Sequence, residues 1–142
     1  MVRKYKVYID ENLPPQLAEG LYKLQQPQNI KDGFEVEVLS IKKVFGQGAK
    51  DEDWIPELGK EKGIVITQDF NIQQTKHQRQ LYIDSGIGIF FLKTPSKNGF
   101  QYWDFVKKMV GEWETIKKII KKENVPFAYR GSSNKPFEKM EF

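Results

Sequence analysis

The chain has 142 residues, of which 39% are hydrophobic and 30% charged, and these values fit one globular domain rather than a disordered chain. It contains no cysteine and one histidine, which excludes disulfides, thiolate nucleophiles and zinc sites built from cysteine or several histidines. The net charge of +4 is compatible with a polyanionic partner without requiring one, and no apolar run approaches the length of a membrane span. The amino-terminal residues show no apolar region typical of a secretion signal, so we expect a cytoplasmic protein without a membrane partner.

The first half of the chain alternates predicted strands and helices. We expect strands at 4–9, 34–40 and 64–67; the second alternates polar and apolar residues like an edge strand, and the third is apolar like a central one. Helices are predicted at 14–24, where two prolines follow Asn12 as a candidate cap, and at 52–62, where Asp51 is the candidate cap. Residues 25–33 and 46–49 are predicted to be loops.

The second half is predicted to contain a helix at 73–85, a strand at 87–92 and a long helix at 100–122. Apolar residues three or four apart in the long helix predict one buried stripe. They are Trp103, Val106, Met109, Val110, Trp113, Ile116, Ile119 and Ile120. Residues 126–142 contain two prolines and a glycine, so we expect one domain over residues 1–125 and an irregular C-terminal tail over 126–142.

This order of elements indicates an α/β fold. Strands that alternate with helices predict a three-layer α/β/α architecture with a central, mainly parallel sheet of about four strands and a long C-terminal helix. In such sheets a ligand binds beyond the carboxyl ends of the strands. The residues that follow the strands are therefore the candidates for a functional site.

Acidic side chains occupy those positions. Asp10 and Glu11 follow the first predicted strand, Asp69 follows the third, and Asp51 precedes a helix. Carboxylates that lie close together repel one another, and a hard divalent cation removes that cost. Such a cation can also activate water and stabilise charge on a phosphoryl group. Because the chain has almost no nitrogen or sulfur ligands, an oxygen site for Mg²⁺ or Mn²⁺ is favoured.

Each acid also has an ordinary structural explanation. Asp51 can simply cap its helix, and Glu52 and Asp53 in the first turn can oppose the helix dipole. Asp69 can hold its own backbone in a turn. Asp10 is the hardest to explain in this way, because a carboxylate directly after a buried strand costs stability unless it has a partner.

Three segments in chain order resemble a known family. Residues 9–15 (IDENLPP), 51–55 (DEDWI) and 64–69 (IVITQD) are similar to the PIN-like families of bacterial and archaeal toxins. Those families show a DENLP opening, a helix start with tryptophan or isoleucine three residues after an aspartate, and an apolar strand followed by T-x-D. The resemblance covers about residues 5–92 and implies a PIN-like fold.

It also implies an Mg²⁺- or Mn²⁺-dependent endoribonuclease that is the toxin component of a type II toxin–antitoxin system. RNA would be the substrate and an antitoxin protein the partner, and a homodimer is left open. By position, the resemblance implies four catalytic acids: Asp10, Glu11, Asp51 and Asp69. All of these except Glu11 would bind the metal. Polar residues would support the site: Asn12, Thr67 and Asn71.

The chain departs from the family pattern at Asn71. Many relatives have a further acid at this position, whereas an amide can ligate through its carbonyl but brings no charge. A second metal ion would therefore be held less well.

Basic residues near predicted strand ends are candidates for holding an RNA backbone. They are Lys42, Lys43, Lys76, Arg79 and Lys93. The lone histidine, His77, is expected at the surface, and Trp54 in the core. Tyr129 and Arg130 in the predicted tail could contact RNA or an antitoxin, although nothing in the sequence requires it.

Two other functions remain open. A PIN-like domain that has lost catalysis, as Asn71 would indicate, could bind nucleic acid or protein without cutting it. A receiver-like signalling domain also uses an acidic pair after its first strand and a lysine after its last, for which Lys93 could serve. Its phospho-acceptor should directly follow an apolar strand, however, whereas Asp51 follows the flexible segment 46–50.

Overall fold

The computed structural model describes residues 3–10, 13–69, 76–93 and 102–141, without the side chains of residues 69 and 76–78. The described strands are β1 (Lys4–Ile9), β2 (Glu35–Ser40), β3 (Ile64–Asp69), β4 (Gly88–Lys93), β5 (Phe127–Ser132) and β6 (Lys135–Met140). The described helices are α1 (Pro15–Gln25), α2 (Gln28–Asp32), α3 (Ile41–Phe45), α4 (Asp51–Lys60), α5 (Lys76–Ser85) and α6 (Tyr102–Lys122).

All described strands join one sheet in the order β2-β1-β3-β4-β5-β6. β1 to β5 are parallel, and β6 pairs antiparallel with β5. β2 lies at one edge and β3 in the interior, which confirms what their polar and apolar patterns predicted. None of the described helices is long and apolar enough to cross a membrane.

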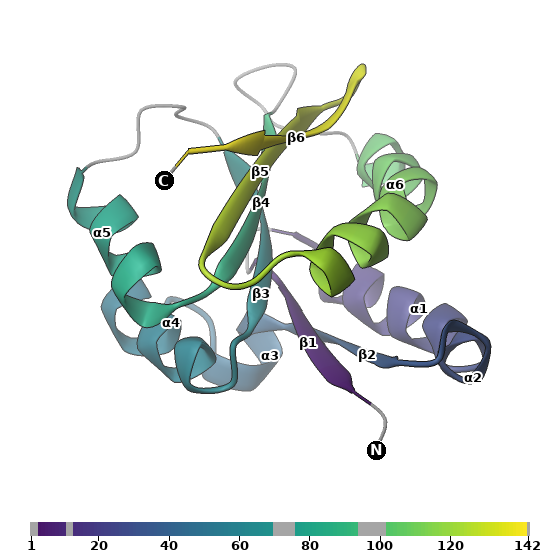
Figure 1. Cartoon of the computed structure of the whole chain (residues 1–142), viewed down its shortest axis with the longest axis horizontal. Helices are drawn as coiled ribbons and strands as arrows, with labels where there is room; N and C mark the ends of the chain where they lie inside the picture. The colour runs from purple at the N-terminus through teal and green to yellow at the C-terminus, as the bar shows by residue number, and fades with distance from the viewer. Residues whose placement is uncertain (1–2, 11–12, 70–75, 94–101, 142) are drawn as a thin grey trace.

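Helices cover both faces of the sheet (Figure 1), which confirms the predicted three-layer α/β/α class. On the face called here the α1/α6 face, Leu17 of α1 and Met109 of α6 pack against the central strands. On the α4/α5 face, Ile55 of α4 and Tyr82 of α5 do the same, together with α3. The sheet is thus buried on both sides along most of its length, as its apolar central strands require.

The C-terminal residues form strands rather than the predicted irregular tail. β5 and β6 extend the sheet beyond the four strands expected, and Phe127, Tyr129 and Phe137 join the core on the α1/α6 face. The residues that indicated a tail are tolerated for specific reasons: Pro136 lies in an edge strand, where a missing N–H costs little, and Gly131 lies in the irregular pairing between Arg130 and Ser132.

Other differences are local. Two short helices were not predicted: α2 lies in a segment expected to be a loop, and α3 directly follows β2. In α6, Trp103 and Val110 are 71% and 52% exposed, although both were assigned to the buried stripe. The buried stripe starts at Phe105 instead. Since Trp103 lies two residues before Phe105, it is turned about 160° away on the helix.

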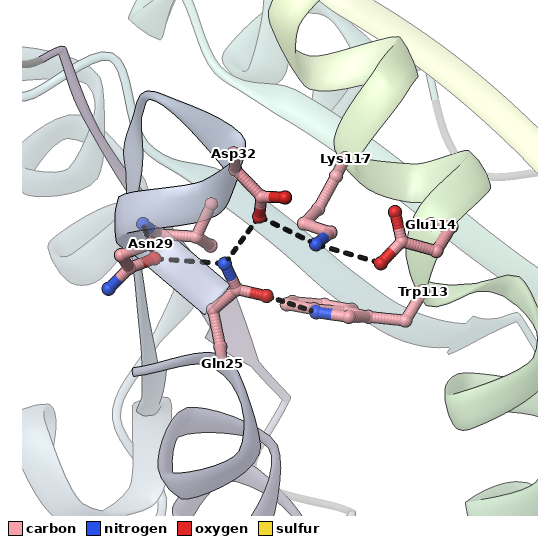
Figure 2. A network of polar contacts seen from close by, with 7 residues as sticks. Gln25, Asn29, Asp32, Trp113, Glu114 and Lys117 are labelled. Carbon is pink, nitrogen blue, oxygen red and sulfur yellow. Dashed lines mark hydrogen bonds and ion pairs between the residues drawn. The ribbon is translucent and has the colours of Figure 1, made fainter. Parts of the chain in front are cut away.

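A buried polar network joins α6 to α1 and α2 (Figure 2). The indole Nε1 of Trp113 donates a 2.9 Å hydrogen bond to Oε1 of Gln25, and Nε2 of Gln25 donates one of 2.9 Å to Asp32. Nζ of Lys117 donates a 2.7 Å hydrogen bond to the same carboxylate. Lys117 is only 2% exposed, so its charge depends on this partner and on Glu114. The network therefore fixes how α6 packs on α1 and α2.

Candidate functional site

The strand order reverses at β1. From β1 the chain passes through α1 on one face to reach β2, and it returns to β3 on the other side of β1 before entering α5 on the opposite face. Adjacent parallel strands whose chains leave toward opposite faces open a crevice beyond their carboxyl ends. In this protein that crevice is expected between the ends of β1 and β3.

Asp10 and Thr67 meet at this point. Ile9 pairs with Ile66, so the next residues along the two strands, Asp10 and Thr67, lie side by side. The hydroxyl of Thr67 donates a 2.6 Å hydrogen bond to Oδ2 of Asp10, and the backbone amide of Asp10 donates a 3.0 Å hydrogen bond to the Ile66 carbonyl. Both side chains are half-buried. The orientation of this carboxylate is therefore set by the sheet.

Asp69 is the last residue of β3. Val65 belongs to the core of the α4/α5 face, and the two-residue period of a strand places positions 67 and 69 on that face as well. Position 69 thus lies two residues beyond Thr67 on the same face of the strand. In the neighbouring strand it pairs in register with Lys93.

Asp51 begins α4, which packs on the same face. Trp54, in the first turn, lies 6.5 Å from the ring of Phe45 in α3, and α3 follows the carboxyl end of β2. Glu61, just after the last turn, accepts a 3.1 Å hydrogen bond from Lys6 in β1. The end of α4 that carries Asp51 is therefore the end toward the carboxyl edge of the sheet.

Asp51 does not cap this helix as predicted. The cap is Lys50, whose backbone is extended and which makes no side-chain capping hydrogen bond, and Asp51 is the first residue inside the helix. An acid there still opposes the helix dipole favourably. The position also weighs against the receiver-like alternative, because Asp51 starts a helix instead of ending a strand. Trp54 is buried in the core, as predicted.

The structure describes only part of the predicted acid group. Glu11, Asn12 and Asn71, and the side chain of Asp69, lie outside the described residues. Within the described part of the chain, no three acidic or histidine side chains gather closely enough to hold a metal ion. The pair of Asp10 and Thr67 is thus the part of the predicted site that the structure shows in contact.

The basic candidates are distributed over several elements. Lys42 and Lys43 belong to α3, and Lys43 forms an ion pair with Glu19 of α1. Arg79 is exposed on α5, the helix that begins at Lys76, whose side chain lies outside the described residues.

Lys93 is exposed at the end of β4, in register with position 69. Of the basic candidates, it is the one that the sheet register places beside an acidic position.

Two buried polar atoms at the same edge were missed by sequence reasoning. Oγ of Ser40, at the end of β2, and Oε1 of Gln68, near the end of β3, are buried without a hydrogen-bond partner among the described residues. Buried polar atoms are ordinarily paired, so each can accept a donor from water or a ligand. A polar residue within the last two positions of a strand is the sequence signal that could have indicated them.

Comparison with known proteins decides the family. A family model described as "PIN like domain" matches residues 5–94, which is more than half of the chain. The chain belongs to the PIN-like domain family. PIN-like domains form a nuclease-like superfamily, and many of them are nucleases. The matched region contains all three aspartates of the predicted site and ends just after β4.

Comparisons with curated proteins and with solved structures add little to the PIN-like match. No curated protein matches the chain. Among solved structures, it is similar to a 3-dehydroquinate dehydratase-like protein from Bifidobacterium longum at 17% identity, with 81% of this chain and 98% of that chain covered and a TM-score of 0.40.

Proposed function

We propose that this PIN-like domain is a divalent-metal-dependent endoribonuclease in which Asp10, Asp51 and Asp69 bind Mg²⁺ or Mn²⁺. The observation that carries the proposal is the 2.6 Å hydrogen bond that orients Asp10 at the switch point of the sheet. Positions 69 and 51 belong to elements that reach the same edge and face. The donors are carboxylate oxygens, which suit a hard cation.

The residues of the chain supply orientation and charge. When bound, the cation would stabilise the negative charge that develops on a phosphodiester during hydrolysis. Thr67 holds one oxygen of Asp10 in place, and the backbone bond from Asp10 to Ile66 holds its main chain. Lys93, beside position 69, offers a cation to a phosphate next to the one that is cut.

We also propose RNA as the substrate and a toxin–antitoxin pair as the cellular setting. Membership of the PIN-like family and the segments IDENLPP and IVITQD support this assignment. Production of the wild-type chain in bacteria should then arrest growth, and the Asp10→Asn variant should not. Growth arrest by both proteins would contradict a toxic nuclease activity.

The direct test is RNA cleavage by the purified protein. Labelled single-stranded RNA is incubated with Mg²⁺, or with EDTA, for the wild type and for Asp10→Asn and Asp51→Asn. Asp53→Asn is the matched control, because Asp53 is an exposed acid in the same first helical turn as Asp51. We expect the first two variants to fall to the level of the EDTA reaction and the control to cut like the wild type.

Two outcomes would contradict the proposal. Equal cleavage by the wild type and Asp10→Asn would mean that a contaminant cuts the RNA. Binding of Mn²⁺ without cleavage of any RNA would favour a catalytically inactive binding module, for which Asn71 is the sequence feature.

A further inference from the structure

A concave surface lies beside the proposed site, outside the part of the chain that matches the family. The carboxyl ends of β4 and β5, the turn that follows and β6 enclose a pocket of about 690 Å³, named here the hairpin pocket. Its described lining includes Lys93, Arg130, Ser132, Asn134, Lys135 and Lys139. With the exception of Lys93, these residues lie beyond the matched residues 5–94. The pocket is therefore a feature that this chain adds to the family core.

The connection between β4 and β5 explains why this surface is open. The crossover from β3 to β4 passes over the α4/α5 face, whereas the next crossover in the same direction passes through α6 on the α1/α6 face. The two crossovers thus have opposite hands, and parallel crossovers are nearly always of one hand. A helix following the usual rule would lie over the α4/α5 face of β4 and β5. Because α6 lies on the other side, that face can hold a pocket.

The pocket continues the line of the proposed site. Phe91 and Ala128 belong to the core of the α4/α5 face, so Lys93 and Arg130, two residues further along their strands, lie on that face as well. Lys93 pairs in register with Asp69 on one side and with Ser132 on the other. β5 lies two strand spacings, about 10 Å, from β3. One RNA strand can therefore reach both places.

The charge of the lining favours an anion. Phe137 belongs to the core of the α1/α6 face, so the two-residue period places Lys135 and Lys139 on that face, where Lys139 forms an ion pair with Glu123. On the α4/α5 face the lining has two cations, Lys93 and Arg130, against one carboxylate, Glu138, which pairs in register with Arg130. Among the described residues, the side chains of Lys93 and Arg130 form no hydrogen bond or ion pair, and Arg130 is half-buried. A half-buried guanidinium is stabilised by a bidentate anion such as phosphate.

We propose that the hairpin pocket binds backbone phosphates of single-stranded RNA, holding the strand so that a neighbouring phosphodiester reaches the carboxylates. This inference rests on the proposed nuclease function for the identity of the polymer. Arg130 provides the main phosphate contact and Lys93 the contact nearest the acids. Both are positioning residues, since neither reaches the bond that is cut.

The test is RNA binding without cleavage. Fluorescence polarisation of a labelled single-stranded RNA of about 12 nucleotides is measured in EDTA at several salt concentrations. Arg130→Gln and Lys93→Gln are compared with the wild type and with Lys118→Gln. Lys118 is an exposed lysine of α6, about 15 Å along the helix from Lys108, which contacts the hairpin through the Lys135 carbonyl. Far-UV circular dichroism and melting curves establish that each variant is folded.

We expect Arg130→Gln to weaken binding several-fold and to reduce the slope of log K against log salt by about 0.7, the value for one phosphate contact on a single strand. Lys93→Gln should act in the same direction, and Lys118→Gln should bind like the wild type. If Arg130→Gln and Lys93→Gln both bind RNA as tightly as Lys118→Gln, the pocket does not bind RNA. This conclusion holds even if the wild type cuts RNA in Mg²⁺. A pocket that binds an acidic protein segment instead would give this result. If Arg130→Gln binds RNA more weakly but the wild type cuts no RNA, the pocket is an RNA-binding site and the proposed nuclease function is wrong.

Discussion

At the scale of single residues, Thr67 is a neutral side chain that orients Asp10, the acid that we propose as a metal ligand. Its hydroxyl lies 2.6 Å from Oδ2 of Asp10, a short hydrogen bond of the kind that a charged acceptor makes. The bond restricts the rotation of the carboxylate, so less orientation must be fixed when a cation binds. Thr67 is thus expected to act through Asp10 and not on the substrate.

We therefore predict that Thr67→Val lowers the rate of Mg²⁺-dependent RNA cleavage about tenfold, the usual effect of losing a group that orients a metal ligand. Thr67→Ser keeps the hydroxyl and should retain most of the activity. Single-turnover cleavage at saturating and limiting Mg²⁺ measures the effect, and urea unfolding checks the stability of both variants. If Thr67→Val is as active as Thr67→Ser, the hydroxyl of Thr67 does not contribute to the site.

Sequence reasoning reached some of these residues and not others. The strand-end rule selected Asp10, which directly follows a predicted strand, and the resemblance to PIN-like families added Thr67 as a supporting residue. It could not predict that Ser40 and Gln68 are buried without partners, since this depends on how the helices pack over the strand ends. The helical spacing of apolar residues misplaced Trp103 in the buried stripe, because the register of that stripe is set by the contacts of Phe105 and Met109.

At the scale of elements, Lys117 joins α6 to α2 through the Asp32 carboxylate at 2.7 Å. Replacing Lys117 by methionine leaves a largely buried carboxylate without its ammonium partner, and we predict a loss of about 3 kcal/mol in the free energy of unfolding. The double variant Asp32→Asn, Lys117→Met removes both charges and should regain part of that loss. Urea unfolding at neutral pH measures it, and a Lys117→Met midpoint equal to that of the wild type would contradict it.

The same pair predicts a pH dependence. Burial by itself raises the pKa of Asp32, but the hydrogen bonds from Lys117 and Gln25 outweigh it, and the pKa lies below its ordinary 3.8. Burial likewise lowers the pKa of Lys117, but its bonds to Asp32 and Glu114 outweigh it, and the pKa lies above 10.5. The ion pair of Asp32 and Lys117 therefore contributes fully to stability between pH 3.8 and pH 10.5. This contribution is lost as the pH falls through the folded-state pKa of Asp32. The wild type should lose more stability on acidification than the double variant, as urea midpoints at pH 6 and pH 2 would show.

Two helical glycines differ in their surroundings and make a matched pair. A Cβ on Gly111 of α6 would meet no atom within 4 Å, so Gly111→Ala should raise the free energy of unfolding by about 0.5 to 1 kcal/mol through helix propensity. A Cβ on Gly59 of α4 would overlap the backbone carbonyl of Ser85 in α5, so Gly59→Ala should lower it despite the same propensity gain. Thermal melts decide the signs, and a stabilised Gly59→Ala would show that α4 and α5 do not pack this closely.

The element boundaries that the sequence predicted well belong to strongly patterned segments. β1 coincides with its predicted range, and β2 starts one residue later than expected. The misses are segments whose local pattern is weak: α2 and α3 are five residues long, and β5 and β6 contain residues that usually interrupt strands. Pairing with β4 overrides that local preference.

At the scale of the whole molecule, the C-terminal hairpin completes the core instead of trailing from it. Phe127, Tyr129 and Phe137 lie 5.7, 5.7 and 5.2 Å from the ring of Phe90 in β4. Loss of one buried phenylalanine costs about 3 to 5 kcal/mol, and a domain has about 5 to 15 kcal/mol in total. A chain that ends after Asn124 should therefore show no cooperative melting transition by circular dichroism. A cooperative transition in that protein would mean that the first four strands form a stable domain alone.

The overall arrangement of strands and helices could be predicted from the sequence only in part. The alternation of strands and helices predicted parallel pairing and both helical layers, because handed crossovers leave few other arrangements. The same rule predicts the wrong hand for the crossover from β4 to β5. No sequence feature of residues 94–126 indicates that α6 packs on the face opposite to α5. The hairpin pocket follows from that exception and so could not be predicted.

We propose that Asp10, Asp51 and Asp69 share one divalent cation at the switch point between β1 and β3. Crystals soaked in Mn²⁺ and measured for anomalous scattering test it without reference to any substrate. We predict one strong peak with oxygens of these three carboxylates about 2.1 Å from it. A map with no peak there, and with these carboxylates turned apart or paired with lysine or arginine side chains, would contradict it.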